Sequence, residues 1–292
     1  MTGRTPGLCL DDGADPGAAL GPRVEASLHA AIDRVTRPSA PPKLREALAY
    51  AVFPGGSRLR PRLCLAVASA HGDGWPRRSD AAAAAAEFVH CASLVHGDLP
   101  SFDDAGRRRG RPSAHGAFGE PIALLVGDAL LVLAFDVLAR AGASEEAVIL
   151  SAATGAVSGV IAGRAWEAEP GVTLDDCHRA KTASLFGASA AMGAIAAGAD
   201  PAPWHYFGET VGLAHQAADD VADALDDEAP RNKSRAGDAH LGRPNVARAH
   251  GVEIARRRVS ALVAAARAAI PPHADGHLRP WLDQLEARLG NA

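Results

Sequence analysis

The sequence has few aromatic residues and no closely spaced cysteines. Aromatic side chains make up 4% of its 292 residues, and segments with the period-two alternation of β-strands are nearly absent. This scarcity argues against a β-rich fold. The cysteines are scattered along the chain without a CxxC pair, at Cys9, Cys64, Cys91 and Cys177. They indicate neither a zinc site nor a disulfide framework, and a reducing, cytoplasmic location fits best.

An excess of charge of one sign and a long apolar run are lacking as well. The chain has 30 Lys and Arg residues against 34 Asp and Glu, which gives a formal net charge of −4. Proteins whose main partner is nucleic acid usually have a clear basic excess, so we expect no such partner. No segment has the roughly 18 uninterrupted apolar residues that cross a bilayer. The best candidate, 122–134, is short and includes Asp128, so we expect no transmembrane segment.

The N-terminal residues lack the features of a targeting sequence. Asp11, Asp12 and Asp15 follow the first residues and no apolar core develops, unlike the pattern of a signal or transit peptide. We expect residues 1–22 to form a flexible leader. A length of 292 residues allows one large domain or two small ones. We assign residues 23–292 to a single domain.

Apolar residues recur at helical spacing along the rest of the chain, beginning with Val24, Leu28, Ile32 and Val35. We therefore expect an all-α protein whose longer helices pack as a bundle around a buried centre. Proline, glycine and capping residues place helices at about 43–52, 81–96, 121–141, 145–168, 174–198, 203–227, 246–269 and 275–289, with another beginning near residue 60. Asp80 is the expected N-cap of the helix over 81–96.

Two aspartate-rich segments are the strongest candidates for chemistry. They are HGDLPSFDDAGRRRG (96–110) and HQAADDVADALDD (215–227). In the second, Asp219 and Asp223 lie four residues apart and therefore project from one face of a helix. Carboxylate oxygens suit Mg²⁺, which proteins often share with the phosphates of a substrate. The alternative is a solvated acidic surface, as is usual for exposed aspartate pairs.

Basic residues directly follow the first acidic cluster. Arg107, Arg108 and Arg109 alone would be a solvated charge run. Beside carboxylates they become candidates for binding diphosphate, because a guanidinium group binds phosphate oxygens through two parallel hydrogen bonds. Acidic and basic groups at the end of an apolar bundle predict a metal–diphosphate site above an apolar cavity.

Several motifs in order resemble the trans-polyprenyl diphosphate synthase family, particularly the bacterial geranylgeranyl diphosphate synthases of carotenoid pathways. The resemblance extends from about residue 45 to residue 285. The motifs are FPGGSRLRP (53–61), EFVHCASLVHGDLPSFDDAGRRRGRPSAH (87–115), FGEPIALLVGDALL (118–131), AGRAWEAE (162–169), HRAKT (178–182), GLAHQAADDVAD (212–223) and LGRPN (241–245).

The resemblance implies an all-α, isoprenoid-synthase-type helical bundle around a deep apolar cavity, with the two aspartate motifs facing each other across its mouth. It also implies a Mg²⁺-dependent prenyltransferase that condenses isopentenyl diphosphate with an allylic diphosphate, giving geranylgeranyl diphosphate (C20). Metal ions and cationic side chains would stabilise the leaving diphosphate. The apolar wall would protect the carbocation from water. A homodimer is implied as well.

The resemblance further assigns roles to individual residues. The metal ligands would be Asp98, Asp103, Asp219, Asp220 and Asp223. The isopentenyl diphosphate would be bound by Gly56, Arg60, His90 and Arg109. The allylic diphosphate would be bound by Arg108 and Lys181, assisted by Thr182, Gln216 and Lys233. The residues with a catalytic role would be Lys181, Asp103 and Asp219.

The first aspartate motif departs from the family pattern. It normally opens with two aspartates, and the first of them, a principal Mg²⁺ ligand, is replaced here by Gly97. Glycine supplies no side-chain oxygen, and the neighbouring Asp98 points about 100° away on a helix. Other departures are Ser57 in place of lysine, Arg164 in place of glutamine and His215 in place of phenylalanine.

These departures leave three interpretations open. The first is an active synthase whose metal binding relies on Asp98, Asp103 and the second motif. The second is a catalytically weak or inactive homologue that forms a heteromer with an active synthase and regulates it. The third is a diphosphate-binding relative with different chemistry, such as a terpene cyclase or a hydrolase. The retained Arg108, Arg109 and Lys181 disfavour the third.

The expected product length follows from sterics. In the family, the growing chain extends below the first aspartate motif, and large residues about one helical turn upstream form the floor of the cavity. Ala92 and Ser93 occupy that turn here. No floor at the fifteen-carbon length is evident, so we expect the twenty-carbon product.

Overall fold

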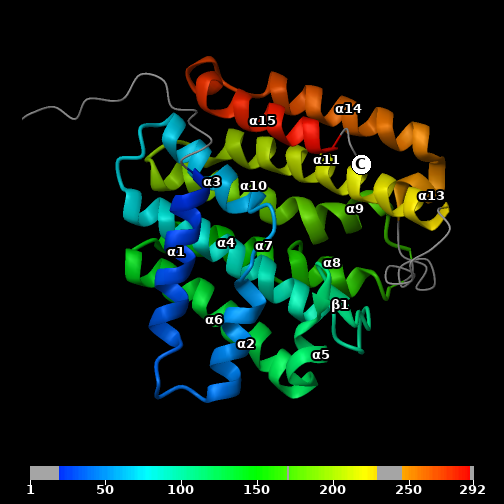
Figure 1. Ribbon diagram of the computed structural model, residues 1–292. Coiled ribbons are helices and arrows are strands. Elements are labelled where there is room, and N and C mark those ends of the chain that lie inside the picture. The colour runs from blue at the N-terminus through cyan, green and yellow to red at the C-terminus, as the bar shows by residue number, and fades with distance from the viewer. Residues whose placement is uncertain (1–19, 170, 229–244, 290–292) are drawn as a thin grey trace, which may run out of the picture.

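The chain folds as a bundle of α-helices (Figure 1), which confirms the expected all-α class. The computed structural model describes residues 20–169, 171–228 and 245–289. The elements of the first part are α1 (Leu20–Val35), α2 (Pro42–Val52), α3 (Leu59–Ala70), α4 (Pro76–Gly97), β1 (Arg107–Arg108), β2 (Arg111–Pro112), α5 (Ala114–Phe118), α6 (Glu120–Ala141), α7 (Ser144–Thr154) and α8 (Val160–Trp166). The second part contains α9 (Leu174–His178), a π-helical turn (Arg179–Ala183), α10 (Ser184–Ala196), α11 (Pro201–Glu228), α13 (Val246–His250), α14 (Val252–Ala268), a 3₁₀ turn (Pro272–Ala274) and α15 (Asp275–Leu289).

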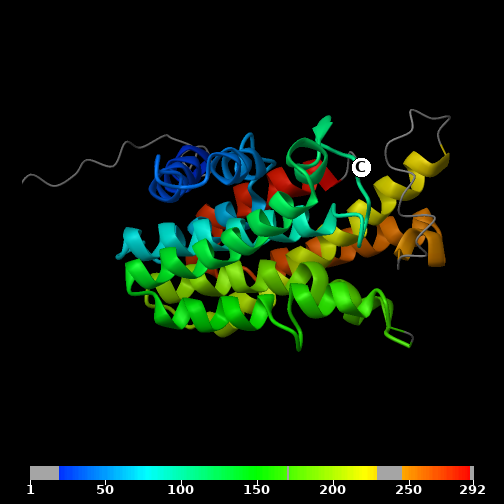
Figure 2. The ribbon, with the colours of Figure 1, turned by 90° about the horizontal axis from the view of Figure 1, so that it is seen from below.

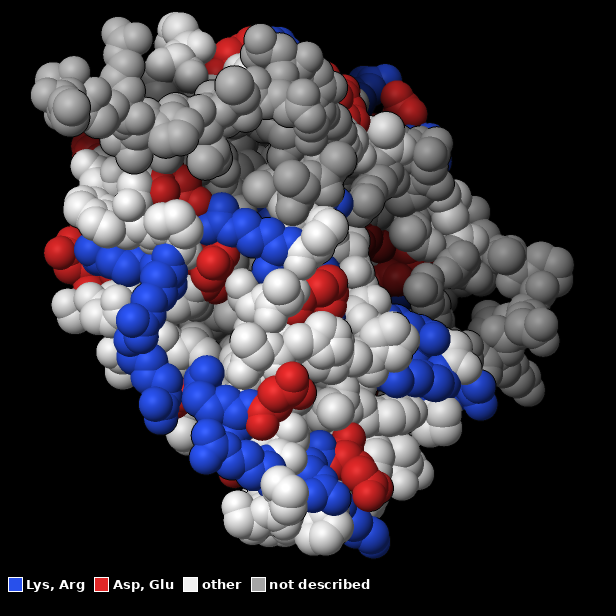
Figure 3. Space-filling model, turned by 60° about the vertical axis from the view of Figure 1, so that its left-hand side comes forward, with Lys and Arg blue, Asp and Glu red and all other residues white. Residues whose placement is uncertain are grey.

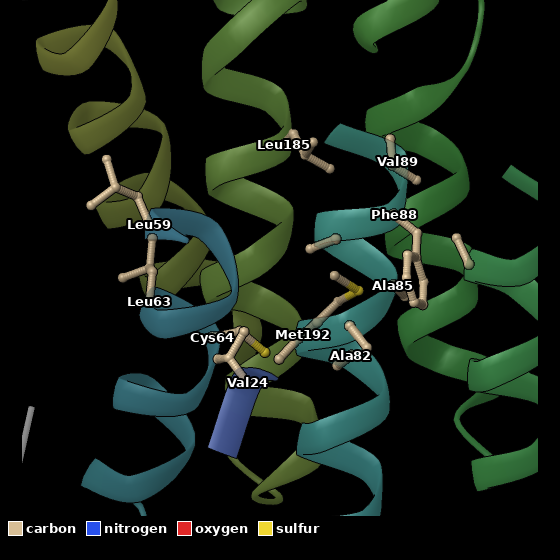
Figure 4. Packing of buried hydrophobic residues seen from close by; sticks show 14 of the residues in the cluster. Val24, Leu59, Leu63, Cys64, Ala82, Ala85, Phe88, Val89, Leu185 and Met192 are labelled. Atoms are coloured by element: carbon tan, nitrogen blue, oxygen red, sulfur yellow. The ribbon is translucent and has the colours of Figure 1, made fainter. Parts of the chain in front are cut away.

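Helix α10 is the centre of the bundle. All of its residues are buried, and α3, α4, α7 and α11 pack around it. Figure 4 shows how side chains from several helices meet beside it, with Cys64 of α3 and Ala82 of α4 close to Met192. Alanine, glycine and serine make up most of α10, and such small side chains let neighbouring helices approach closely.

Other helices cover the two sides of this centre. On one side α11 packs against α14, and α14 contacts α15. On the opposite side α4 packs along α6, while α1 and α2 lie across the outside of α4 and α6 (Figure 2). The last three residues of the predicted leader belong to the bundle. Residues 20–22 form the start of α1, and Leu20 is buried.

Several long predicted helices are interrupted in the structure. The helix expected over 145–168 is divided into α7 and α8, because the chain turns between Gly155 and Gly159, where a Cβ at residue 159 would overlap the backbone of Ala153. The segment 174–198 contains the π-helical turn, and 246–269 breaks at Gly251. Backbone close approach of this kind leaves no periodic signal in a sequence.

The start of α4 and the segment after it also differ from expectation. Helix α4 begins at Pro76, a residue suited to a first helical turn. Asp80 therefore lies within the helix, where it accepts a hydrogen bond from Arg23 at 2.6 Å. After α4 the chain forms a short antiparallel hairpin in which Arg107 pairs with Pro112 and Arg108 with Arg111.

Helix α6 is long and apolar enough to cross a membrane, as judged by its 22 residues and composition. We expected no such segment, since Asp128 interrupts its apolar run. Eight of its residues are buried in the bundle, among them Leu130, Leu133 and Leu138. A helix that is buried inside a bundle can pass the same test of length and composition.

Charges of both signs lie close together on the surface. On the face shown in Figure 3, acidic side chains lie beside and between the basic ones. One example is Asp136, which pairs with both Arg34 and Arg140 at 2.8 Å. Charges of the two signs are thus interspersed on this face.

Arg58 connects three segments at the base of α3. Its side chain is buried, and it donates hydrogen bonds to Glu87 of α4 at 2.6 Å, to Glu25 of α1 at 2.8 Å and to the carbonyl oxygen of Val52 at 2.8 Å. These carboxylates raise its pKa. Glu87 is buried too, so its charge depends on this partner.

We predict that Arg58→Met lowers the free energy of unfolding by about 3 kcal/mol, because it leaves the buried Glu87 carboxylate without its cation. Urea denaturation of the two proteins measures the difference. As a control, Arg257→Met removes an exposed pair with Glu253 and should change stability by less than about 0.5 kcal/mol. Equal effects at the two sites would contradict the role assigned to Arg58.

Candidate active site

A polar cavity of about 570 Å³ opens between α3, α4, the hairpin, α8, the π-helical turn and α11. Its cationic lining consists of Arg58, Arg60, Arg108, Arg109, Arg164 and Lys181. Its acidic lining consists of Glu87 and Asp219. Cations therefore outnumber carboxylates in a partly enclosed space, where electrostatic interactions are stronger than in bulk water. This cavity suits a strongly anionic ligand.

The loop before α3 forms one wall of the cavity. Gly56 lies against the hairpin so closely that a Cβ there would come 2.7 Å from Nη2 of Arg109. Four residues later, the Arg60 guanidinium lies 4.3 Å from the centre of the Phe186 ring. Burial lowers the pKa of Arg60 to about 10, and its Nε makes no hydrogen bond to any described residue. Arg60 is thus a buried cation with an unused hydrogen-bond donor, which suits the binding of an anion.

The hairpin brings two further arginines to the cavity. Arg109 lies in its turn with a φ of 49°, so successive arginine side chains point in different directions. Arg108 donates two hydrogen bonds to Asp98, at 2.6 and 2.7 Å, in a side-on guanidinium–carboxylate pair. Asp98 is buried at the end of α4. Its carboxylate therefore holds the hairpin in place.

A chain of alternating charges connects the first aspartate motif to the π-helical turn. Arg164 of α8 donates to Asp103 and to Glu167, each at 3.1 Å, and Lys181 donates to the other oxygen of Glu167. Gly163 makes this arrangement feasible, because a Cβ there would overlap the backbone of Lys181. Irregular π-helical turns occur frequently at functional sites.

The second aspartate motif lies on α11 and its two neighbouring aspartates point in different directions. Asp219 lines the cavity, and its carboxylate is 58% exposed and lies 3.3 Å from Nδ1 of His215. Asp220 is buried and accepts hydrogen bonds from Gln216 at 2.9 Å and from the backbone NH of Val246 at 2.7 Å. Burial raises the pKa of Asp220. Asp220 thus joins α11 to α13.

Thr182 and Gln216, two other predicted site residues, connect the cavity to Asp220. Thr182 lines the cavity and donates to the Gln216 side chain at 2.6 Å. Gln216 in turn bonds to Asp220, so Thr182 is held by a short polar chain. Asp223 follows Asp219 by one helical turn. Lys233 lies outside the described residues.

An apolar cavity of about 310 Å³ adjoins the polar one. It lies between α4, α6, α7 and α8, and its walls include Val89, Ala92 and Leu131. Three residues line both cavities: Ser93, Val160 and Arg164. The two cavities together have the shape of a molecule with an anionic head and a hydrocarbon tail, and Ala92 lies in the wall of the apolar part.

Among the described residues, the carboxylates of Asp98 and Asp103 in the first aspartate motif pair with arginines, whereas Asp219 of the second motif lines the polar cavity. Within residues 20–169, 171–228 and 245–289, no three Asp, Glu, His or Cys side chains converge as a metal cluster. Asp98 is occupied by Arg108, and Asp103 is bound by Arg164. Asp219 lines the cavity with its side chain 58% exposed, and its carboxylate oxygens are of the kind that Mg²⁺ prefers.

The comparison with known proteins identifies the family. A model of the polyprenyl synthetase family matches residues 41–269. The chain belongs to this family. Among polyprenyl synthetases, it is 49% identical over 255 residues to the geranylgeranyl diphosphate synthase of Cereibacter sphaeroides, covering 85% of this chain and 88% of that one. It is 46% identical over 259 residues to the enzyme of the same name from Rhodobacter capsulatus, covering 87% and 90%.

Solved structures of the family have the same fold. The crystal structure of the Helicobacter pylori geranyltransferase complexed with magnesium and isoprenyl diphosphate matches with a TM-score of 0.80. The two chains are 26% identical, and the match covers 95% of this chain and 100% of that one. The geranyltranstransferase of Thermotoga maritima matches with a TM-score of 0.79, 27% identity and coverage of 94% and 99%. These matches confirm the predicted isoprenoid-synthase-type bundle.

Sequence reasoning gave no site role to Arg164, His215 or Glu87, although the first two were noted as departures from the family pattern. All three line the polar cavity. The position of Arg164 directly after Gly163, in the AGRAWEAE motif, was the available signal. The partner that matters, Asp103, is 61 residues away in the sequence.

We predict that His90 makes stability depend on pH. Burial, together with Arg60 and Arg109, lowers its pKa well below 6.5. Below pH 6.5 the unfolded chain therefore binds a proton that the folded chain does not, and stability falls as the pH falls. Between pH 7 and pH 5, this residue should account for a loss of up to about 2 kcal/mol, the value for a histidine that stays neutral in the folded protein.

The measurement is urea denaturation at several pH values for the native protein and His90→Asn, whose amide does not titrate. The slope with pH should be shallower in His90→Asn. The control is His250→Asn, which replaces an exposed histidine on α13. An equally steep slope in His90→Asn would show that the pKa of His90 is the same in the folded and unfolded chains, and would contradict the prediction.

Proposed function

We propose that the protein is a geranylgeranyl diphosphate synthase, which condenses isopentenyl diphosphate with an allylic diphosphate. The observation that carries this conclusion is the junction of a cation-rich cavity with an apolar cavity, in a chain of the polyprenyl synthetase family. An allylic diphosphate has the matching shape, since a hydrocarbon chain is attached to a compact anion. The similar proteins from Cereibacter sphaeroides and Rhodobacter capsulatus support the twenty-carbon product.

In this reaction, the bond between C1 of the allylic chain and the diphosphate oxygen breaks, and diphosphate leaves with the electron pair. The double bond of isopentenyl diphosphate forms a new carbon–carbon bond to C1, and the resulting cation loses a proton. Arg108 and Lys181 lie where they would bind the leaving diphosphate. Fixed positive charges of this kind stabilise the negative charge that develops on the leaving group.

The second substrate would bind at the opposite wall of the polar cavity. Arg60, Arg109 and the Gly56 backbone meet there, and His90 lies beside them in its neutral form at pH 7. The isopentenyl diphosphate would be held by these groups with its double bond toward the junction. Val160 and the apolar walls behind it would keep water away from the carbocation.

Magnesium is part of this proposal at the second aspartate motif. Asp219 and Asp223 would hold the ion, and Asp103 would assist only if Arg164 released it. When bound, Mg²⁺ supplies positive charge to the leaving diphosphate. Asp98 and Asp220 are left out of this ligand set, because Arg108 and the α13 backbone already occupy their carboxylates.

The alternative of an inactive partner subunit receives no support from the comparisons. The two relatives with 46–49% identity are themselves named as synthases, and each matches over most of its length. Six cationic side chains line the polar cavity, although Ser57 stands there in place of a lysine. We therefore place the function with the synthases.

The test is prenyl transfer by the purified protein with Mg²⁺, isopentenyl diphosphate and a fifteen-carbon allylic diphosphate. We expect a twenty-carbon product, identified by chromatography after removal of the diphosphate. Asp219→Asn should lower the rate by roughly a hundredfold or more, because it removes a carboxylate from the metal site. A native protein that folds and binds both substrates without forming product would contradict the proposal.

We predict that Ala92→Phe shortens the product. Ala92 lines the apolar cavity about one turn before the end of α4, so a phenyl ring there would fill space needed by the growing chain. The main product should change from twenty to fifteen carbons when a ten-carbon allylic substrate is supplied. Ala92→Ser, which adds one oxygen atom, should keep the twenty-carbon product. Equal product lengths in both variants would show that the chain extends elsewhere.

A homodimer is also proposed, with α6 in its interface. Leu124, Leu125 and Val132 are exposed at helical spacing on α6, and Val132 is 70% exposed. Exposed apolar surface of this kind marks many protein–protein interfaces. Val132→Glu should shift the protein from dimer to monomer in light scattering after size exclusion. Val157→Glu, at an exposed valine between α7 and α8, is the control. A monomeric native protein would contradict this prediction.

The cellular setting is proposed on the state of the cysteines. Cys64, Cys91 and Cys177 are buried and unpaired. Burial raises the pKa of Cys91 to about 12, which keeps the thiol protonated and unreactive. Free thiols of this kind fit a reducing cytoplasm. A carotenoid pathway as the user of the product stays a prediction from the resemblance.

A further inference from the structure

Gly97, at the end of α4, leaves a space that Arg164 fills. A Cβ at residue 97 would overlap Nη2 of Arg164, and it would lie 3.6 Å from Oδ2 of Asp103. A carboxylate at residue 97 would therefore begin where the guanidinium group now lies. Arg164 can occupy this position because residue 97, where the family has a metal ligand, has no side chain.

The guanidinium group of Arg164 is held firmly in this position. Its Nη1 donates to Asp103 and to Glu167, each at 3.1 Å, and its carbon lies 5.5 Å from the centre of the Phe102 ring. The side chain is 20% exposed, toward the cavities. Contacts on several sides restrict the rotamers of this long side chain, so little entropy remains to be lost when it binds a ligand.

Arg164 lies where the polar and the apolar cavity meet. It is one of three residues that line both cavities, and the other two, Ser93 and Val160, carry no charge. An allylic diphosphate with its tail in the apolar cavity would place its first phosphate at this junction. The Arg164 guanidinium is the only charged group among the described residues that lines both cavities.

The same position is poorly suited to a divalent cation. Asp103 and Glu167 are the nearest carboxylates, and Arg164 and Lys181 already balance their charge. A cation placed there would meet the guanidinium group at close range and would lack the ligand that residue 97 does not provide. Repulsion between like charges at such distances is strong in a partly buried site.

We propose that Arg164 binds the diphosphate of the allylic substrate directly, and supplies the positive charge that a metal ion at the first aspartate motif would otherwise supply. This inference rests on the proposed function, since it names the allylic substrate as the ligand. Metal binding is then confined to the second motif. Diphosphate binding becomes partly independent of metal, because a fixed guanidinium group remains when Mg²⁺ is removed.

The test is calorimetric binding of inorganic pyrophosphate in the presence of EDTA. The native protein should bind it, and Arg164→Gln should bind at least about tenfold more weakly, because one charge-assisted contact is lost. Arg164→Lys should lie between them, since lysine keeps the charge and loses the paired hydrogen bonds. The matched control is Arg179→Gln, whose arginine pairs with Glu209 outside the cavity and should bind within twofold of native. Equal affinities of Arg164→Gln and native protein would overturn the inference.

A second variant keeps the test decisive if Arg164→Gln fails to fold. Gly97→Asp removes no existing charged side chain and places a carboxylate beside Arg164, whose guanidinium group must shift to make room. It should weaken metal-free pyrophosphate binding at least about fivefold, because the new carboxylate competes for the guanidinium group. It should also tighten binding of Mn²⁺, used as a probe for Mg²⁺, in a titration followed by electron paramagnetic resonance. Unchanged binding of both ligands would contradict the role of Arg164.

These measurements separate the inference from the proposed function. If the native protein forms no twenty-carbon product while pyrophosphate binding still depends on Arg164, the proposed synthase activity fails and the diphosphate site stands. If product forms at ordinary rates while Arg164→Gln binds pyrophosphate as tightly as native, the function stands and the inference is wrong.

Discussion

The candidate site depends on an excess of positive charge held next to an apolar cavity. Cationic side chains repel one another when they share a partly buried space, so each must be fixed by packing or by a carboxylate that points elsewhere. The structure does this in different ways. Asp98 orients Arg108, Glu167 orients Lys181, and the Phe186 ring supports Arg60. The charge that remains uncompensated faces the cavity, where a diphosphate would neutralise it.

The helical framework explains how distant segments provide these charges. Arg60 comes from the start of α3, Arg164 from α8 and Lys181 from the π-helical turn. All of them line the same polar cavity, and Arg60 lies against Phe186 near the start of α10, the buried helix around which the bundle packs. The apolar cavity lies beside the charges because α4 contributes to both, with Ser93 at the junction and Ala92 within the apolar part.

Much of this was predictable from the sequence, and the exceptions have physical causes. The all-α class followed from helical periodicity, and Arg60, Arg109 and Lys181 from motifs that the cavity now brings together. Asp98 and Asp220 were expected to bind metal. Their actual partners, Arg108 and the Val246 amide, depend on a hairpin turn and on a contact between α11 and α13. Local spacing does not reveal such long-range pairs, nor does it reveal Arg164 in the space beside Gly97.

The decisive measurement is a crystal structure of the protein with Mg²⁺ and an unreactive allylic diphosphate, in which sulfur replaces the bridging oxygen. We predict metal ions beside Asp219 and Asp223, the hydrocarbon tail against Ala92, and the Arg164 guanidinium within hydrogen-bonding distance of the diphosphate. A metal ion bound between Asp103 and the diphosphate, with Arg164 turned away, would contradict this description of the site.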